Sequence, residues 1–176
     1  MAKAGSTFFL RAELDMLAAG TYNEEPIPLG AFLNPLADQA LVIHNVSVQI
    51  ADATQPEAGP FQEDVVFNLG WNLTTSSQND FDTVFLADNS VVASGRYTVM
   101  SSQTGSPQTY VEHDVRDVMP QDYTAGYTVA AESLFLGAHG SGTATNGDYK
   151  ISIVMECSQI KLGKNEAINL ALSQTQ

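Results

Sequence analysis

Residues 10–16 read Leu-Arg-Ala-Glu-Leu-Asp-Met, and every second residue is apolar while each residue between is charged. A strand turns successive side chains to opposite faces, whereas a helix repeats its faces about every 3.6 residues. The strict alternation therefore predicts a half-buried β-strand. This two-residue rhythm decides the fold, because it returns along most of the chain.

The alternating pattern predicts eight strands in total. One of these runs sets Phe67, Leu69 and Trp71 against polar or small neighbours. Segments rich in Gly, Pro, Asn, Asp and Ser separate the runs, and these residue types favour turns. The predicted strands are 10–16, 41–50, 65–74, 81–86, 91–100, 110–118, 127–136 and 149–160.

Eight such strands without helical crossovers predict an all-β fold, an eight-stranded antiparallel β-sandwich of jelly-roll type. The connection 17–40 is longer than a hairpin needs, so we expect it to pass from one sheet to the other, with 29–36 outside both sheets. No repeat or linker divides the sequence, and residues 1–176 are predicted to form a single domain.

The segment 164–172 allows two structures. Asn165 offers a helix cap, and good helix formers follow it. Ile168, Leu170 and Leu172 also alternate, as in an edge strand. We favour a short C-terminal helix and leave the strand open.

The chain is acidic, with a formal net charge of −13. No Lys or Arg lies between Arg11 and Arg96, although carboxylates continue throughout. Nucleic acids bind mainly through cationic side chains, so we expect no direct contact with DNA or RNA. No stretch approaches the ~20 apolar residues of a membrane-spanning helix, so we expect no membrane insertion. The start MAKAGST lacks the apolar run of a signal peptide, which predicts synthesis in a cytoplasm.

The sequence lacks the motifs of the common catalytic sites, including the nucleophile elbow, the HExxH zinc motif and the phosphate-binding loop. The glycine-rich segment 137–142 leads into a second turn and is predicted to be a hairpin loop. A cupin-like metal site needs two histidines one residue apart, and none of His44, His113 and His139 has such a neighbour. We therefore expect no catalysis and no cofactor.

Carboxylate groups raise the question of calcium, which takes oxygen ligands brought together by a loop. The candidates are the pair Asp80 and Asp82, the pair Glu63 and Asp64, and the group Asp114, Asp117 and Asp122. None of these has the spacing of an EF-hand loop. A solvated acidic surface is the favoured interpretation, so no metal site is predicted.

Against this background, the end of the chain resembles the ends of single jelly-roll capsid proteins from icosahedral viruses of archaea and bacteria. The resemblance rests on 127–137, a Gly/Asn turn, 149–157 and the closing stretch 161–173. It implies a coat subunit of the virion shell, made in the host cytoplasm, that assembles with copies of itself and with other capsid proteins. Many such coats carry a basic N-terminal arm, whereas only Lys3 precedes Phe8 here, which puts genome packaging by this chain in doubt.

Two other classes stay open. A carbohydrate-binding, adhesin-like or pilin-like sandwich would present aromatic side chains, around Trp71 or at Tyr97, Tyr110 and Tyr123. The alternating pattern favours Trp71 as a core residue instead. A cupin-like or β-sandwich enzyme is the third class. Cys157 lies in an apolar run and is predicted to be a small buried hydrophobic residue.

Overall fold

A computed structural model of the chain describes residues 6–16, 21–33, 39–54, 56, 66–78, 84–102, 109–141 and 149–174. These residues form nine strands, a short 3-10 turn and one α-helix. The elements are β1 (Phe8–Met16), β2 (Tyr22–Pro28), β3 (Gln39–Asp52), β4 (Val66–Thr74), β5 (Val91–Ser102), β6 (Thr109–Val118), η2 (Pro120–Asp122), β7 (Tyr127–Val129), β8 (Ser133–Ser141), β9 (Tyr149–Lys161) and α1 (Lys164–Gln174). The all-β prediction is confirmed. Within the described ranges, no helix has the length and apolar character needed to cross a membrane.

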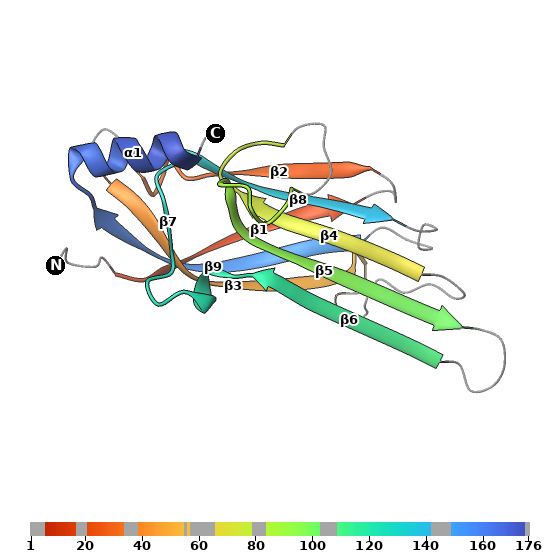
Figure 1. Cartoon of the computed structure of the whole chain (residues 1–176). Helices are drawn as coiled ribbons and strands as arrows, with labels where there is room; N and C mark the ends of the chain where they lie inside the picture. The colour runs from red at the N-terminus through yellow and green to blue at the C-terminus, as the bar shows by residue number, and fades with distance from the viewer. Residues whose placement is uncertain are drawn as a thin grey trace.

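Two antiparallel sheets face each other and enclose the core (Figure 1). One sheet has the strand order β1-β9-β3-β7, and the other has the order β2-β8-β4-β5-β6. Strands from the two ends of the chain pair with each other, and the pairing continues toward the middle of the chain. The pairs are β1 with β9, β2 with β8, β3 with β7 and β4 with β5. These four pairs, divided between two sheets, form the jelly-roll topology. β6 is an additional strand at the edge of the second sheet.

The core is built by alternate residues of the strands, as the two-residue rhythm predicts. On β1, Leu10 and Leu14 are buried, whereas Arg11 and Glu13 point outward. Trp71 on β4 is 2% exposed, so its prediction as a core residue is confirmed.

Residues 17–40 contain a strand that the pattern did not predict. β2 pairs with β8 and forms one edge of the five-stranded sheet. The chain therefore crosses to this sheet after β1, runs one strand there, and returns to the other sheet at β3. The strand was not predicted because it contains Pro26. Proline lacks an N–H and is tolerated in sheets mainly at edges, which is where β2 lies.

Two other predicted strands differ from the structure. The run 127–136 divides into β7 and β8, which lie in different sheets. Residues 130–132 carry the chain between them, and Leu29 secures this crossing by donating its N–H to the carbonyl of Glu132 at 2.9 Å. The run 81–86 was also wrong as a strand, since 84–86 are irregular and then turn, while 81–83 lie outside the described residues.

The predicted hairpin loop at 137–142 was wrong for its first five residues, which belong to β8. β8 and β9 also lie in different sheets, so no hairpin joins them. The glycines serve close packing instead of a turn, because a Cβ on Gly137 would overlap the Tyr22 hydroxyl and one on Gly140 would overlap the Tyr149 hydroxyl. Residue 142 lies outside the described residues.

The predicted C-terminal helix is confirmed, and it extends to Gln174. Its cap differs from the prediction, since Asn165 lies inside the helix. The carboxylate of Glu166 accepts the N–H of Gly163 at 2.9 Å. A glutamate at this position stabilises the first turn by satisfying an otherwise unpaired backbone donor.

Candidate functional site

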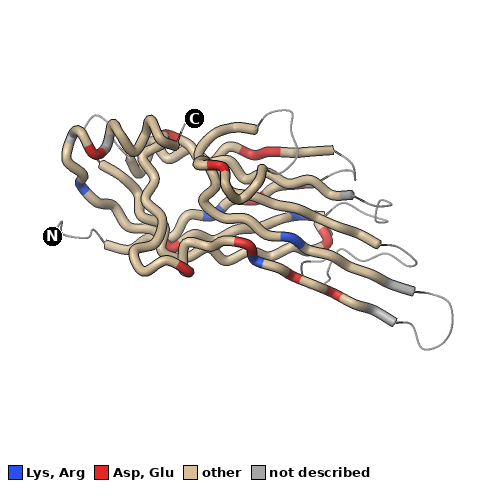
Figure 2. Tube along the Cα trace, viewed as in Figure 1, with Lys and Arg blue, Asp and Glu red and all other residues tan. Residues whose placement is uncertain are grey.

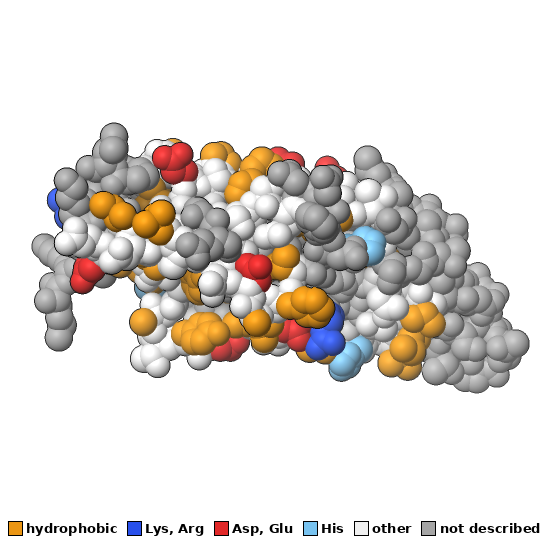
Figure 3. Space-filling model, turned by 45° about the horizontal axis from the view of Figure 1, so that its top comes forward, with side chains coloured by type: hydrophobic (Ala, Val, Ile, Leu, Met, Phe, Trp, Pro, Cys, Tyr) orange, Lys and Arg blue, Asp and Glu red, His pale blue; other side chains and the backbone are white. Residues whose placement is uncertain are grey.

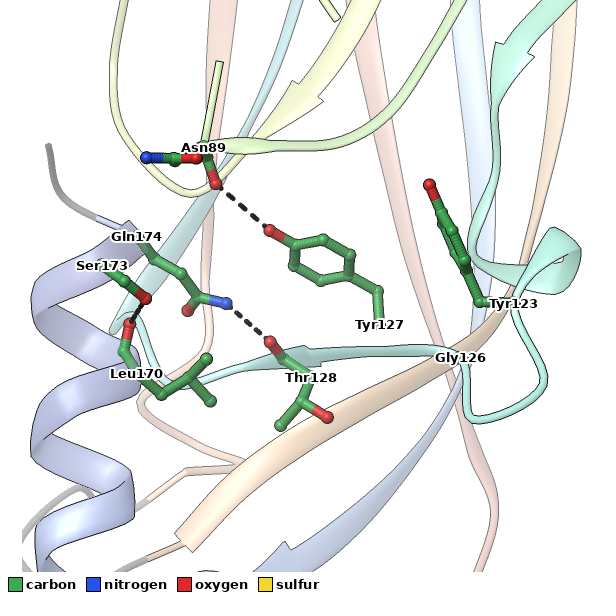
Figure 4. Close-up of a pocket in the computed structure, with 8 residues that line it drawn as sticks. All are labelled: Asn89, Tyr123, Gly126, Tyr127, Thr128, Leu170, Ser173 and Gln174. Atoms are coloured by element: carbon green, nitrogen blue, oxygen red, sulfur yellow. Dashed lines mark hydrogen bonds between the residues drawn. The ribbon is translucent and has the colours of Figure 1, made fainter. Parts of the chain in front are cut away.

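A cavity of about 500 Å³ opens where the β4–β5 connection, β7 and α1 meet. Its lining residues are Asn89, Tyr123, Gly126, Tyr127, Thr128, Leu170, Ser173 and Gln174, which Figure 4 draws together. The volume lies in the range of roughly 300–1,000 Å³ that small-molecule sites occupy. None of these lining residues is charged, and the wall combines aromatic, amide and hydroxyl groups.

Gln174 holds the end of α1 against the sandwich. Its side-chain oxygen accepts the N–H of Ala130 at 3.0 Å, and its amide nitrogen donates to the carbonyl of Thr128 at 2.6 Å. Its backbone carbonyl accepts the hydroxyl of Thr75 at 2.6 Å. Gln174 is almost fully buried, so these bonds fix one wall of the cavity.

Two tyrosines from one short segment form the aromatic part of the cavity. The Tyr127 hydroxyl donates to the backbone carbonyl of Asn89 at 3.3 Å, and Figure 4 shows its ring pointing toward that residue. Burial, chiefly, raises the pKa of Tyr127, so its hydroxyl stays neutral. Tyr123 is half exposed and leaves much of its ring open to a ligand.

The turn that carries these tyrosines is held by glycine and glutamine. Gly126 has a φ of +69°, and a Cβ there would overlap the carbonyl of Ile43. The Gln121 side chain bonds both backbone groups of Val46, accepting its N–H and donating to its carbonyl, each at 3.1 Å. The turn is therefore fastened to β3, and the cavity wall is preorganised.

An apolar row crosses the outer surface of the five-stranded sheet. Val66 on β4 lies opposite Met100 on β5, and Met100 lies opposite Val111 on β6. All three side chains are about half exposed. Directly opposed residues in a sheet have neighbouring Cβ atoms, so the three side chains form one continuous patch, here called the apolar row.

Further apolar side chains are exposed on α1 and in the β4–β5 connection, two segments that also contribute residues to the cavity wall. Ile168 and Leu172 lie one turn apart on α1, and both are at least half exposed. Phe85 in the β4–β5 connection is 90% exposed, and Leu86 beside it is also exposed. Figure 3 shows hydrophobic side chains in several separate groups across the visible face, and a histidine lies beside one of these groups.

Of the carboxylates considered for calcium, the described group Asp114, Asp117 and Asp122 forms no cluster. The pairs Asp80 and Asp82, and Glu63 and Asp64, lie outside the described residues. Asp114 lies 3.7 Å from Arg116, Asp117 pairs with Arg96 at 2.8 Å, and Asp122 accepts the N–H of Met119 at 3.1 Å. The three histidines stand on β3, β6 and β8. In the part of the chain that the structure describes, no three His, Cys, Asp or Glu residues lie close enough to share a metal ion.

The aromatic residues considered for carbohydrate binding lie in different surroundings. Trp71 and Tyr97 are buried, whereas Tyr123 lines the cavity. Tyr110 lies in β6, and its side chain is outside the described part. Sequence reasoning missed Tyr127, which looked like an ordinary strand residue, and Gln174, which follows the predicted helical stretch.

Cys157 is buried in β9, as predicted. Burial raises the pKa of its thiol to about 12. The thiolate is the reactive form of cysteine, so this residue is inert at neutral pH.

No protein-family model matches this chain. No curated protein matches it either. Among solved structures, it is similar to VP1 of Trichodysplasia spinulosa-associated polyomavirus, described in complex with sialylated precision glycooligomers. The two are 9% identical, with 89% of this chain and 96% of that chain covered and a TM-score of 0.35. The strand pairing of this chain itself identifies the jelly-roll sandwich.

Proposed function

We propose that this chain is a structural subunit of a virion shell, a jelly-roll coat protein that assembles with copies of itself and with other capsid proteins. The observation that carries the proposal is the grouping of exposed apolar side chains on a few elements. Isolated apolar side chains are normal on protein surfaces, but contiguous patches mark sites of association. The apolar row and the Ile168–Leu172 pair are two such groups.

The architecture supports the same proposal at the level of analogy. Jelly rolls serve as viral coat subunits, as lectins and as cupins, so the fold alone does not choose among them. The strand pairing matches this topology throughout, with one extra strand at an edge. The net charge of −13 fits a shell layer without direct nucleic-acid contact. The proposal includes no catalysis and no bound cofactor.

Electron microscopy and sedimentation of the purified chain test this proposal. We expect capsomers or larger particles. Replacing both Ile168 and Leu172 with Glu should remove most of the fast-sedimenting material, because a charge cannot be buried at an apolar contact without a partner. Asn169→Glu is the matched control, since Asn169 is an exposed polar residue on the same helix. A strictly monomeric parent protein at high concentration would contradict the proposal.

The cavity supports a second candidate function, the binding of a neutral glycan. Sugar rings stack on aromatic side chains and hydrogen-bond to amides and hydroxyls, and the cavity offers both kinds of group. A glycan array with the parent protein, Tyr123→Ala and the neighbouring Thr124→Ala tests this function. We expect Tyr123→Ala to lose binding and Thr124→Ala to keep it. A parent protein that retains no glycan would exclude this candidate.

A further inference from the structure

β6 is an edge strand with an open side. Among the described residues, β5 is its only partner strand. It is ten residues long, and Figure 1 shows it along the outer margin of the five-stranded sheet. An edge of this length presents backbone donors and acceptors to another chain, and proteins often protect such edges with charges. The charges of β6 follow one another along this margin in Figure 2.

The two faces of β6 are defined by its register. One face carries the charged residues that line a hollow of about 240 Å³ beside Val48 and Ile50 of β3, namely Glu112, Asp114 and Arg116. The opposite face belongs to the outer surface of the sheet, and it carries Val111, His113, Val115 and Asp117. Arg96 and Asp117 pair on this outer surface at 2.8 Å.

A second copy of the chain could pair with β6 antiparallel to it, about a two-fold axis perpendicular to the sheet. In an antiparallel pair, directly opposed residues lie on the same face of the sheet. Neighbouring residues of β6 lie on opposite faces, so the two-fold axis must pass through a residue and not between two residues. An axis at His113 sets Glu112 against Asp114. An axis at Asp114 or at Arg116 sets that residue against itself. Like charges directly opposite each other destabilise a sheet, so these registers are disfavoured.

The axis at Val115 gives a different result. Asp114 then lies opposite Arg116 of the second copy, and the symmetry repeats this pair. The register of β6 with β5 shifts between Arg116 and Val118, so the regular part of the strand ends at Arg116. Val115 lies opposite itself, so every opposed pair within 114–116 is either apolar or opposite in charge. Asp114 and Arg116 are each nearly half exposed and are available for such contacts.

We infer that β6 pairs with β6 of a second copy in this register, joining two five-stranded sheets into one continuous sheet about a two-fold axis at Val115. This inference rests on the proposed function, since it specifies one contact of the assembly. The interface is isologous, so one surface serves both copies. Backbone hydrogen bonds supply attraction, as in other cases of strand addition, and the charge pattern selects the register.

Charge exchange provides the first test, read by analytical ultracentrifugation. Asp114→Arg alone places Arg against Arg, and Arg116→Asp alone places Asp against Asp. Each single variant should weaken dimerisation by about tenfold or more. An equimolar mixture of the two single variants should regain it, because each mixed pair is again Arg against Asp. The double variant should also regain it. Circular dichroism checks that each variant is folded.

Disulfide trapping provides the second test and does not depend on affinity. In this register the Cα atoms at Val115 lie about 4.5–5.5 Å apart. A disulfide spans roughly 4.4–6.8 Å, so Val115→Cys should cross-link to itself under mild oxidation. His113→Cys should not, because residue 113 does not lie opposite itself in this register. Cys157 is buried and leaves the background low. Any of four results would overturn the inference. The parent protein does not dimerise, or the single charge variants dimerise as the parent does. The mixture of the two variants stays dissociated, or both cysteine variants cross-link equally.

These outcomes are separable from those of the proposed function. Shell-like particles without cross-linking at Val115→Cys would leave the coat function standing and reject this contact. A cross-linked dimer that never forms larger particles would confirm the contact and reject the shell.

Discussion

β9 and β6 share the two-residue rhythm but lie in opposite surroundings. β9 runs between β1 and β3 in the middle of its sheet, and Ile151, Ile153 and Met155 are almost completely buried. β6 lies at an edge, where charged residues occupy one face and valines alternate with His113 and Asp117 on the other. The comparison shows that alternation identifies a strand without reporting how deeply it is buried.

The largest expected effect separates the two strands directly. Ile153→Ala should lower the free energy of unfolding by about 2–5 kcal/mol, because it leaves a cavity in the core. Val115→Ala in β6 should lower it by less than about 1 kcal/mol, since Val115 is only partly covered. Urea unfolding followed by Trp71 fluorescence measures both. Equal losses would mean that β6 is as deeply packed as β9.

The next effect tests how β5 connects the edge strand to the core. A Cβ on Gly95 would lie 2.7 Å from the indole nitrogen of Trp71 and 2.8 Å from the Val115 carbonyl oxygen. Gly95→Ala should therefore lower the free energy of unfolding by about 1–3 kcal/mol through overpacking. Gly30→Ala is the control, because no atom lies within 4 Å of its added Cβ. That variant should stay within about 0.5 kcal/mol of the parent in the same unfolding experiment.

Two tyrosine hydroxyls offer a finer comparison. The Tyr22 hydroxyl donates to the Glu24 carboxylate at 3.0 Å, so Tyr22→Phe should lower the free energy of unfolding by about 1–2 kcal/mol. The buried Tyr149 hydroxyl has no hydrogen-bond partner among the described residues. Tyr149→Phe should therefore leave stability unchanged or raise it slightly, because it removes an unsatisfied polar group. A large loss in Tyr149→Phe would show that the hydroxyl is hydrogen-bonded in solution.

The smallest effect appears only in alkali. Burial raises the pKa of Tyr149 from 10.0 to about 12. Between these two values the unfolded chain releases the phenolic proton while the folded chain keeps it, so stability falls as the pH rises. The free energy of unfolding of Tyr149→Phe should therefore fall less steeply with pH than that of the parent. Thermal unfolding across alkaline pH measures this difference. Identical slopes for the parent and the variant would contradict the assignment.

Much of the fold was predictable because burial on one face leaves a local mark in the sequence. The alternation in β1, β4 and β9 located these strands and the core position of Trp71. The helix formers after Gly163 located α1. β2 was missed because its prolines resemble a break, although an edge strand needs backbone donors on only one side.

The candidate site was less predictable, because its residues come from distant segments. Asn89, Tyr127 and Gln174 are separated along the chain, and no local pattern marks them as neighbours. Only Tyr123 was named in advance, as one of several tyrosines. The hydrogen bonds of Gln174 are what place α1 beside β7 and create the cavity.

The amino-acid sequence by itself determined the strand period, the apolar residues of the core, the acidic charge and the C-terminal helix, since each depends on residues close together in the chain. Only the tertiary structure decided that 127–136 divides between two sheets, that β6 lies at an open edge and that the two tyrosines face a cavity. Strand neighbours and burial depth arise from contacts between residues far apart in the chain, and a local repeat of two carries no information about them.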